Sequence, residues 1–191
     1  MTSANQSMRT LVLAGLVALA CVVFLAAQET RHETVNPAAN PADDAKPNSD
    51  AVPDVYSVPT DFERVITLRF KNKTDLLAGF QKAVKEENIR NAVILSGIGS
   101  VISYHVHQVS NRTFPSKNVY VKNPTEAADL LTTTGYVINR RVHAHVTLAT
   151  PEKAFGGHLE PGTEVFTFAI VTIGVLNPTL DLTRLDDKTY R

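Results

Sequence analysis

The chain has 191 residues, which is enough for one domain with appended segments. Its 19 basic and 19 acidic residues balance, which argues against the strongly basic surface of a typical nucleic-acid-binding protein. No Trp is present, so a core must be built from Ile, Val, Leu and Phe.

The first 27 residues have the layout of an export signal. Arg9 gives a positive flank, residues 11–27 are almost wholly apolar, and a polar stretch comes directly after them. The pattern predicts a signal peptide cleaved after Ala27 and a periplasmic or secreted protein. An uncleaved membrane anchor is the alternative, although about 17 apolar residues lie at the short limit for crossing a bilayer. Cleavage would also remove Cys21, the chain's only cysteine.

Residues 28–60 are rich in Pro, Ala, Asn and Asp, and no apolar periodicity begins before Val52. We expect a disordered linker here, because such a composition cannot bury enough apolar surface to fold. Five of the ten prolines fall in this segment: Pro37, Pro41, Pro47, Pro53 and Pro59.

The globular part spans 61–178 and opens with a strand and a helix. Residues 65–70 alternate in the β-prone manner of a strand. Thr74 is placed to cap a helix that continues to about Asn88, with Asp75 favourable in its first turn.

Strands are expected through the rest of the domain. Gly97 and Gly99 interrupt the apolar stretch 92–109, and because a β-branched strand comes after them, they indicate a kink or bulge and not a phosphate loop. Residues 127–138 could begin as a helix, but T-T-T-G-Y-V-I favours strand. The other expected strands are 117–122, 142–149 and 165–176, followed by a frayed polar tail at 179–191. One helix among about six or seven strands predicts an α+β domain on a mostly antiparallel sheet.

Three histidines are spaced like metal ligands. His143 and His145 are two residues apart in a strand, so both rings point to one face while Val142, Ala144 and Val146 point to the other. His158 comes after a Gly-Gly pair, where the backbone can bend and bring a third imidazole back. Three imidazoles with an open fourth position are typical of a zinc site. Hydrogen-bonded structural histidines or an interface cluster would be the alternatives.

The other candidate groups are weaker. His105 and His107 also share one face of a strand, where they could add ligands or form a separate site, but exposed positions on a solvated face are the favoured interpretation. Glu152 and Glu160 could supply a fourth ligand or orient an imidazole, but turn residues are the favoured interpretation. No G-x-S-x-G motif is present, and the mature chain would have no thiol nucleophile, so no catalytic residue is identified.

The order of four motifs resembles the plants-and-prokaryotes-conserved (PPC) domain over residues 64–176. These motifs are G-I-G-S-V at 97–101, T-T-G-Y-V-I at 133–138, H-A-H-V-T-L-A at 143–149 and G-G-H-L at 156–159. The resemblance implies a compact domain on a mostly antiparallel sheet, assembled as a homotrimer. It also implies that His143, His145 and His158 bind a divalent metal, commonly zinc. Prokaryotic members are often described as DNA-binding.

The chain departs from that family in two places. An export signal stands where plant members carry DNA-binding hooks, and Ile170 stands where many members have an acidic residue. We therefore expect an exported metal-binding domain, with a small molecule or anion at the metal and membrane contact only through an uncleaved N-terminus. A metal-dependent hydrolase or lyase using a zinc-bound water is one alternative. DNA binding is another, and export disfavours it.

Overall fold

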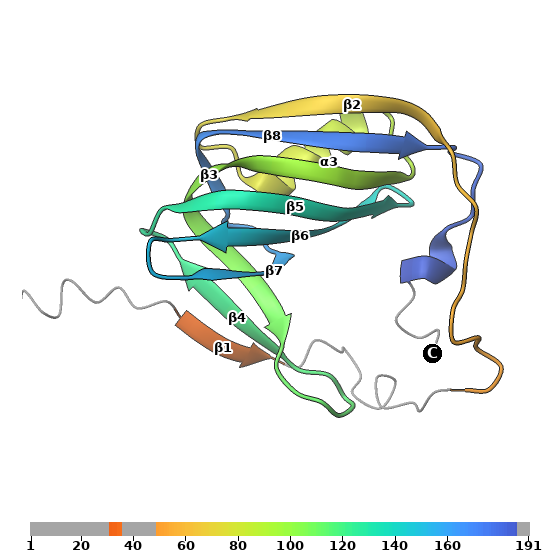
Figure 1. The fold of residues 1–191 in the computed structure, drawn as a ribbon, viewed down its shortest axis with the longest axis horizontal. Helices are drawn as coiled ribbons and strands as arrows, with labels where there is room; N and C mark the ends of the chain where they lie inside the picture. The colour runs from red at the N-terminus through yellow and green to blue at the C-terminus, as the bar shows by residue number, and fades with distance from the viewer. Residues whose placement is uncertain (1–30, 36–48, 187–191) are drawn as a thin grey trace, which may run out of the picture. The chain divides into compact units, whose positions relative to one another are not determined.

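The computed structural model describes the backbone of residues 31–35 and the whole of residues 49–186 (Figure 1). The predicted export signal, residues 28–30 and 36–48 of the predicted linker, and the last five residues lie outside these ranges. Within them, no helix has the length and apolarity that a membrane crossing requires.

The described chain forms one eight-stranded sheet and a single α-helix (Figure 1). All strand pairings are antiparallel, which confirms the predicted α+β fold. In chain order the elements are β1 Arg31–Val35, β2 Phe62–Lys71, α3 Leu76–Glu86, β3 Ala92–Val109, β4 Asn118–Asn123, β5 Ala128–Ile138, β6 Arg141–Ala149, β7 Ala154–Leu159, β8 Glu164–Leu176 and the 3-10 helix η1 Thr183–Asp186.

Strand β3 organises the sheet, because its two halves have different neighbours. The first half lies between β8 and β5, and the second half pairs with β4 and β7. The register with β8 shifts around Gly99, where an added Cβ would lie 2.4 Å from the carbonyl oxygen of Phe168. The glycines therefore mark an irregularity, as predicted, but the strand continues through it. This course carries the end of β3 to the β6–β7 hairpin (Figure 1).

Helix α3 contributes to the core through one apolar face. Leu76, Phe80 and Val84 are buried, and the rings of Phe80 and Phe70 meet edge to face at 5.1 Å. The cap is Asp75, where Thr74 was expected: its carboxylate accepts from the backbone N–H of Ala78 at 2.8 Å. The expected position was wrong by one residue because Asp75 still has extended backbone angles and so precedes the first helical turn.

Two segments expected to be irregular contain structure. Strand β1 lies in the predicted linker and pairs with the edge of β4, whose unpaired backbone groups can accept another strand. The prediction of a frayed tail from 179 is wrong up to Asp186. Leu182 is buried with Ile138 and Leu176, and the turn η1 comes directly after it. Leu182, with Leu180 packed against the same cluster, thus holds an otherwise polar segment against the domain.

Candidate metal centre

The β6–β7 hairpin presents the predicted histidines. On β6, Ala144 and Val146 are buried, whereas His143 and His145 lie on the other face, as the alternation predicts. The hairpin turn is closed by a hydrogen bond from the N–H of Thr150 to the carbonyl of Lys153 at 2.9 Å. β7 then runs back antiparallel to β6 and places His158 directly opposite His145.

The Gly-Gly pair before His158 has another role than the predicted bend. Gly156 and Gly157 lie within β7, where neighbouring backbones approach closely. A Cβ on Gly156 would lie 2.2 Å from the carbonyl oxygen of Val146, and one on Gly157 would lie 2.3 Å from that of His107. The glycines therefore allow β7 to fit tightly between β6 and β3, which brings His158 to the rings of both strands.

The structure brings the three predicted residues together. The Nε2 atoms of His143 and His145 are 3.3 Å apart. The ring of His158 lies 4.9 Å from that of His143 and 5.3 Å from that of His145, measured between centroids. One ligand nitrogen from each residue falls within 4.8 Å of the others, a spacing at which one cation can collect all three.

Two imidazoles of this group, those of His145 and His158, are held in their neutral form. Burial, followed by the neighbouring His107, His143 and His145 rings, lowers the pKa of His158 from 6.5 to about 4. Burial and the rings of His143 and His107 also lower the pKa of His145. Neutral imidazole is the form that binds metal, so these two rings are ready to act as ligands near pH 7.

A carboxylate from the C-terminal turn orients His143, and sequence reasoning missed it. Asp186 Oδ1 accepts from His143 Nδ1 at 2.8 Å, and its Oδ2 accepts from Arg141 at 2.6 Å. Burial opposes ionisation of Asp186, but the hydrogen bonds from His143 and Arg141 outweigh it and lower the pKa of the carboxyl. With the proton on Nδ1, the Nε2 lone pair of His143 faces the cluster. No local motif indicates this contact, because the two residues are far apart in sequence.

His107 belongs to the same group of side chains, contrary to the expectation of a solvated position. Its side chain is only 19% exposed, and β7 pairs with the second half of β3 and places His158 opposite His107. The two rings are 4.6 Å apart, and His107 Nδ1 donates to Glu160 Oε1 at 2.6 Å. Glu160 is therefore more than an ordinary turn residue. We call His107, His143, His145 and His158 the histidine cluster.

His105 and Glu152 lie outside both candidate ligand groups found among the described residues. His105 Nδ1 bonds to the carbonyl of Pro161 at 2.9 Å, and its ring faces Tyr120. Glu152 is exposed in the hairpin turn.

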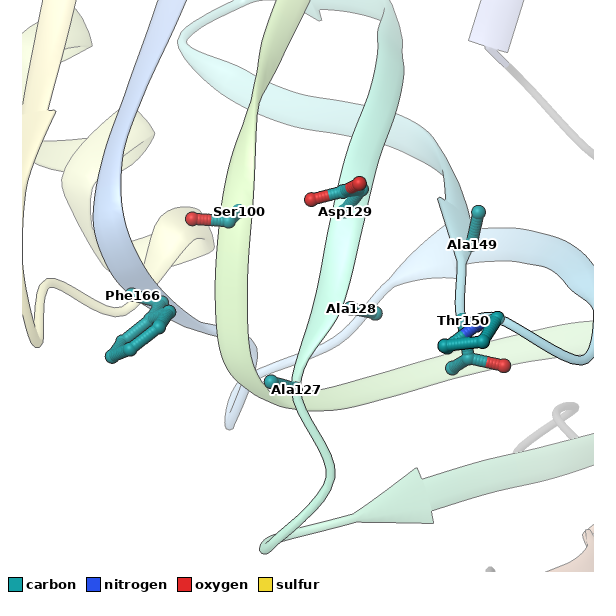
Figure 2. A pocket seen from close by; sticks show the side chains of 8 residues that line it. Ser100, Ala127, Ala128, Asp129, Ala149, Thr150 and Phe166 are labelled. Atoms are coloured by element: carbon teal, nitrogen blue, oxygen red, sulfur yellow. The ribbon is translucent and has the colours of Figure 1, made fainter.

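A separate pocket of about 390 Å³ lies where β3, β5 and β8 meet the β6–β7 turn (Figure 2). Its lining is mostly small or apolar, with Asp129 as the carboxylate, and includes no histidine. Ser100 on its wall is already hydrogen-bonded to Thr167 at 2.7 Å. The pocket is thus chemically unlike the histidine cluster.

Comparison with known proteins agrees with this architecture. The solved structures of similar fold include a PPC protein from Pyrococcus horikoshii, with a TM-score of 0.51 and 24% identity over 63% of this chain and 85% of that one. A metal-containing protein from Archaeoglobus fulgidus has a TM-score of 0.51 and 22% identity over 63% of this chain and 86% of that one.

One curated relative, the bifunctional protein GlmU of Synechococcus sp. (strain JA-3-3Ab), is 26% identical over 129 residues, or 67% of this chain. The match spans only 20% of that protein's length. A family model described as the Plants and Prokaryotes Conserved (PCC) domain matches residues 59–177. This match includes β2 to β8 and every residue of the histidine cluster, so the chain belongs to the plants and prokaryotes conserved family, as its ordered motifs indicate.

Proposed function

We propose that the protein is an exported metal-binding PPC domain that holds one divalent ion, zinc, on His143, His145 and His158. The observation that carries the proposal is the convergence of three imidazoles on one face of the sheet, where burial lowers the pKa of His145 and of His158. Imidazole nitrogen is a preferred donor for zinc, and three such ligands leave one tetrahedral position open. The metal content named for the Archaeoglobus fulgidus protein supports the same assignment.

The surrounding residues fit such an ion. Asp186 fixes the ring of His143, which is the usual way that a carboxylate orients a metal-binding histidine. His145 is exposed, so the open position faces solvent, and we place a small molecule or anion there. In the described cluster, Glu160 and Asp186 both bond to imidazoles, which leaves neither carboxylate free as a general base. The geometry thus supports binding better than hydrolase or lyase chemistry.

We also propose that the domain forms a homotrimer, with an apolar face of the sheet as its contact. Ile98 on β3 lies directly opposite Ile170 on β8, and the two side chains are 60% and 37% exposed. Phe166 and Phe168 continue the exposed row along β8. Contiguous exposed apolar residues of this kind mark association surfaces. Ile170 is thus one member of the proposed contact.

Metal analysis of the purified protein tests the site. We expect about one zinc per chain, as for one three-histidine site, and its loss in the variant with His143, His145 and His158 all changed to Ala. His105→Ala is the matched control, because it removes a histidine from the same face outside both ligand groups. Equal, negligible metal in both proteins would refute the proposal.

Light scattering on the same samples tests the trimer, and a reporter fused to residues 1–27 tests export. Retention in the cytoplasm would restore DNA binding as a candidate.

A further inference from the structure

The histidine cluster extends across three neighbouring strands in one row. His145 on β6 pairs with His158 on β7, and His158 pairs in turn with His107 on β3. Side chains directly opposite on adjacent strands share a face and lie in contact range. His158 is therefore the middle member, with His143 and His145 on one side and His107 on the other.

The side with His107 has a complete set of ligand atoms of its own. One atom each from His107, His158 and Glu160 lies within 4.8 Å of the other two. This group contains two imidazole nitrogens and one carboxylate oxygen, a donor set that divalent transition metals accept. The side chains of His107 and Glu160 are 19% and 21% exposed, compared with 41% for His143, so this end is the more enclosed.

The enclosed end is also held in place. The backbone N–H of Glu160 donates to the carbonyl of His105 at 3.0 Å. Thr163 Oγ1 accepts from the N–H of His105 at 2.9 Å, which ties the turn after β7 to β3 a second time. The ring of Tyr120 packs against His107 at 5.1 Å. A cation bound by this group would take the place of the proton between His107 Nδ1 and Glu160 Oε1, and the ring would carry its proton on Nε2 instead, so the two ligand atoms already lie side by side.

We propose that His107, His158 and Glu160 form a second cation position, which one metal ion occupies as an alternative to the position on His143, His145 and His158. The two positions exclude each other because they share His158. A neutral imidazole has one nitrogen lone pair for a metal, and serving two ions would require removing its remaining proton. This proposal depends on the proposed function only because both positions use His158 as a ligand.

Cobalt(II) titration of the chelator-treated full chain, followed by visible absorption, tests the second position. In the variant carrying both His143→Ala and His145→Ala, only the enclosed group is intact. We expect this variant to bind one Co²⁺ more weakly than the natural chain, with a changed spectrum because an oxygen replaces nitrogen donors. Adding Glu160→Gln should weaken the remaining binding by about 10- to 100-fold or more. Glutamine keeps a hydrogen-bond acceptor for His107, so folding is preserved, and circular dichroism checks this.

Adding Glu152→Gln to the same double variant is the matched control, because it makes the same change at an exposed carboxylate outside both ligand groups, and it should leave the remaining binding unchanged. No Co²⁺ binding by the double variant, or binding that Glu160→Gln leaves unaltered, would overturn the second position while leaving the first intact. Conversely, His143→Ala without effect on the natural chain's affinity would count against the proposed function and not against the second position. Two Co²⁺ ions per natural chain would overturn the mutual exclusion.

Discussion

At one end of the histidine cluster His143 donates to Asp186, and at the other end His107 donates to Glu160. The contact is the same, but the carboxylates are held differently. Asp186 belongs to a short turn in a segment that packs on the domain through Leu180 and Leu182, whereas the backbone of Glu160 is bonded directly to β3. The comparison indicates that the end with His143 and Asp186, here called the outer end, can adjust to a ligand from solvent. The enclosed end with His107 and Glu160, here called the inner end, is preorganised.

The largest effect is expected from His158→Ala, which removes the ligand common to both ends. Loss of either end alone leaves the other group of three, but loss of His158 leaves neither group complete. We expect zinc affinity to fall by at least about 100-fold, the upper range even for residues that only orient ligands. Competition against a chromogenic zinc chelator measures it. A zinc affinity of the variant within about threefold of that of the natural chain would mean that the cluster is not the site, because even the loss of a residue that only orients a ligand has a larger effect.

Substitution of each glycine in β7 should separate the two ends. In Gly157→Ala the new methyl group meets the carbonyl of His107, and in Gly156→Ala it meets that of Val146. We expect each to lower the free energy of unfolding by about 1–3 kcal/mol, the usual cost of overpacking. Gly157→Ala should mainly impair metal binding by His107, His158 and Glu160. Gly156→Ala should mainly disturb the β6–β7 hairpin, which carries His143, His145 and His158. Urea unfolding measures the first effect, and Co²⁺ spectra of the two variants measure the second. Identical spectra would contradict this division.

Acid should destabilise the metal-free protein through the ring at the centre of the cluster. The pKa of His158 is about 4 in the folded protein and near 6.5 when unfolded, so the unfolded chain binds more protons in between. The stability that the neutral ring contributes is complete above pH 6.5 and is lost as the pH falls toward 4. Urea unfolding in chelator at several pH values measures this loss. In His158→Ala the dependence should be shallower, and an unchanged slope would show that other groups cause it.

Features that depend on alternation and spacing are predictable from the sequence, whereas contacts that depend on the path of a remote segment are not. His143 and His145 share a face because they are two residues apart on β6, and the ordered motifs identified the family correctly. Strand β7 was not expected, since Gly-Gly usually marks a bend and only a close neighbouring backbone explains it within a strand.

The position of His107 could not be inferred from its own strand for the same reason. Periodicity assigns a residue to a face, but it does not say which strand will lie beside it and supply the neighbouring side chains on that face. Here β7 lies beside the second half of β3, so His107 meets His158 and Glu160 instead of solvent. The contact of Asp186 with His143 likewise depends on Leu182, whose burial no repeating pattern in the polar tail indicates.

The smallest effect is expected at the outer carboxylate. Asp186→Asn keeps a side chain of the same shape but removes the charge that holds the proton on Nδ1 of His143 and that pairs with Arg141. Because the tail is attached through Leu182 and not through this contact alone, the fold should persist, and zinc affinity should fall by about 10-fold.

Glu160→Gln in the otherwise natural chain should change zinc affinity less, since His143, His145 and His158 remain intact and the enclosed position is only the alternative one. Measuring both variants by chelator competition ranks the two ends. A larger loss from Glu160→Gln would mean that the ion prefers the enclosed end and that the outer histidines are the secondary position.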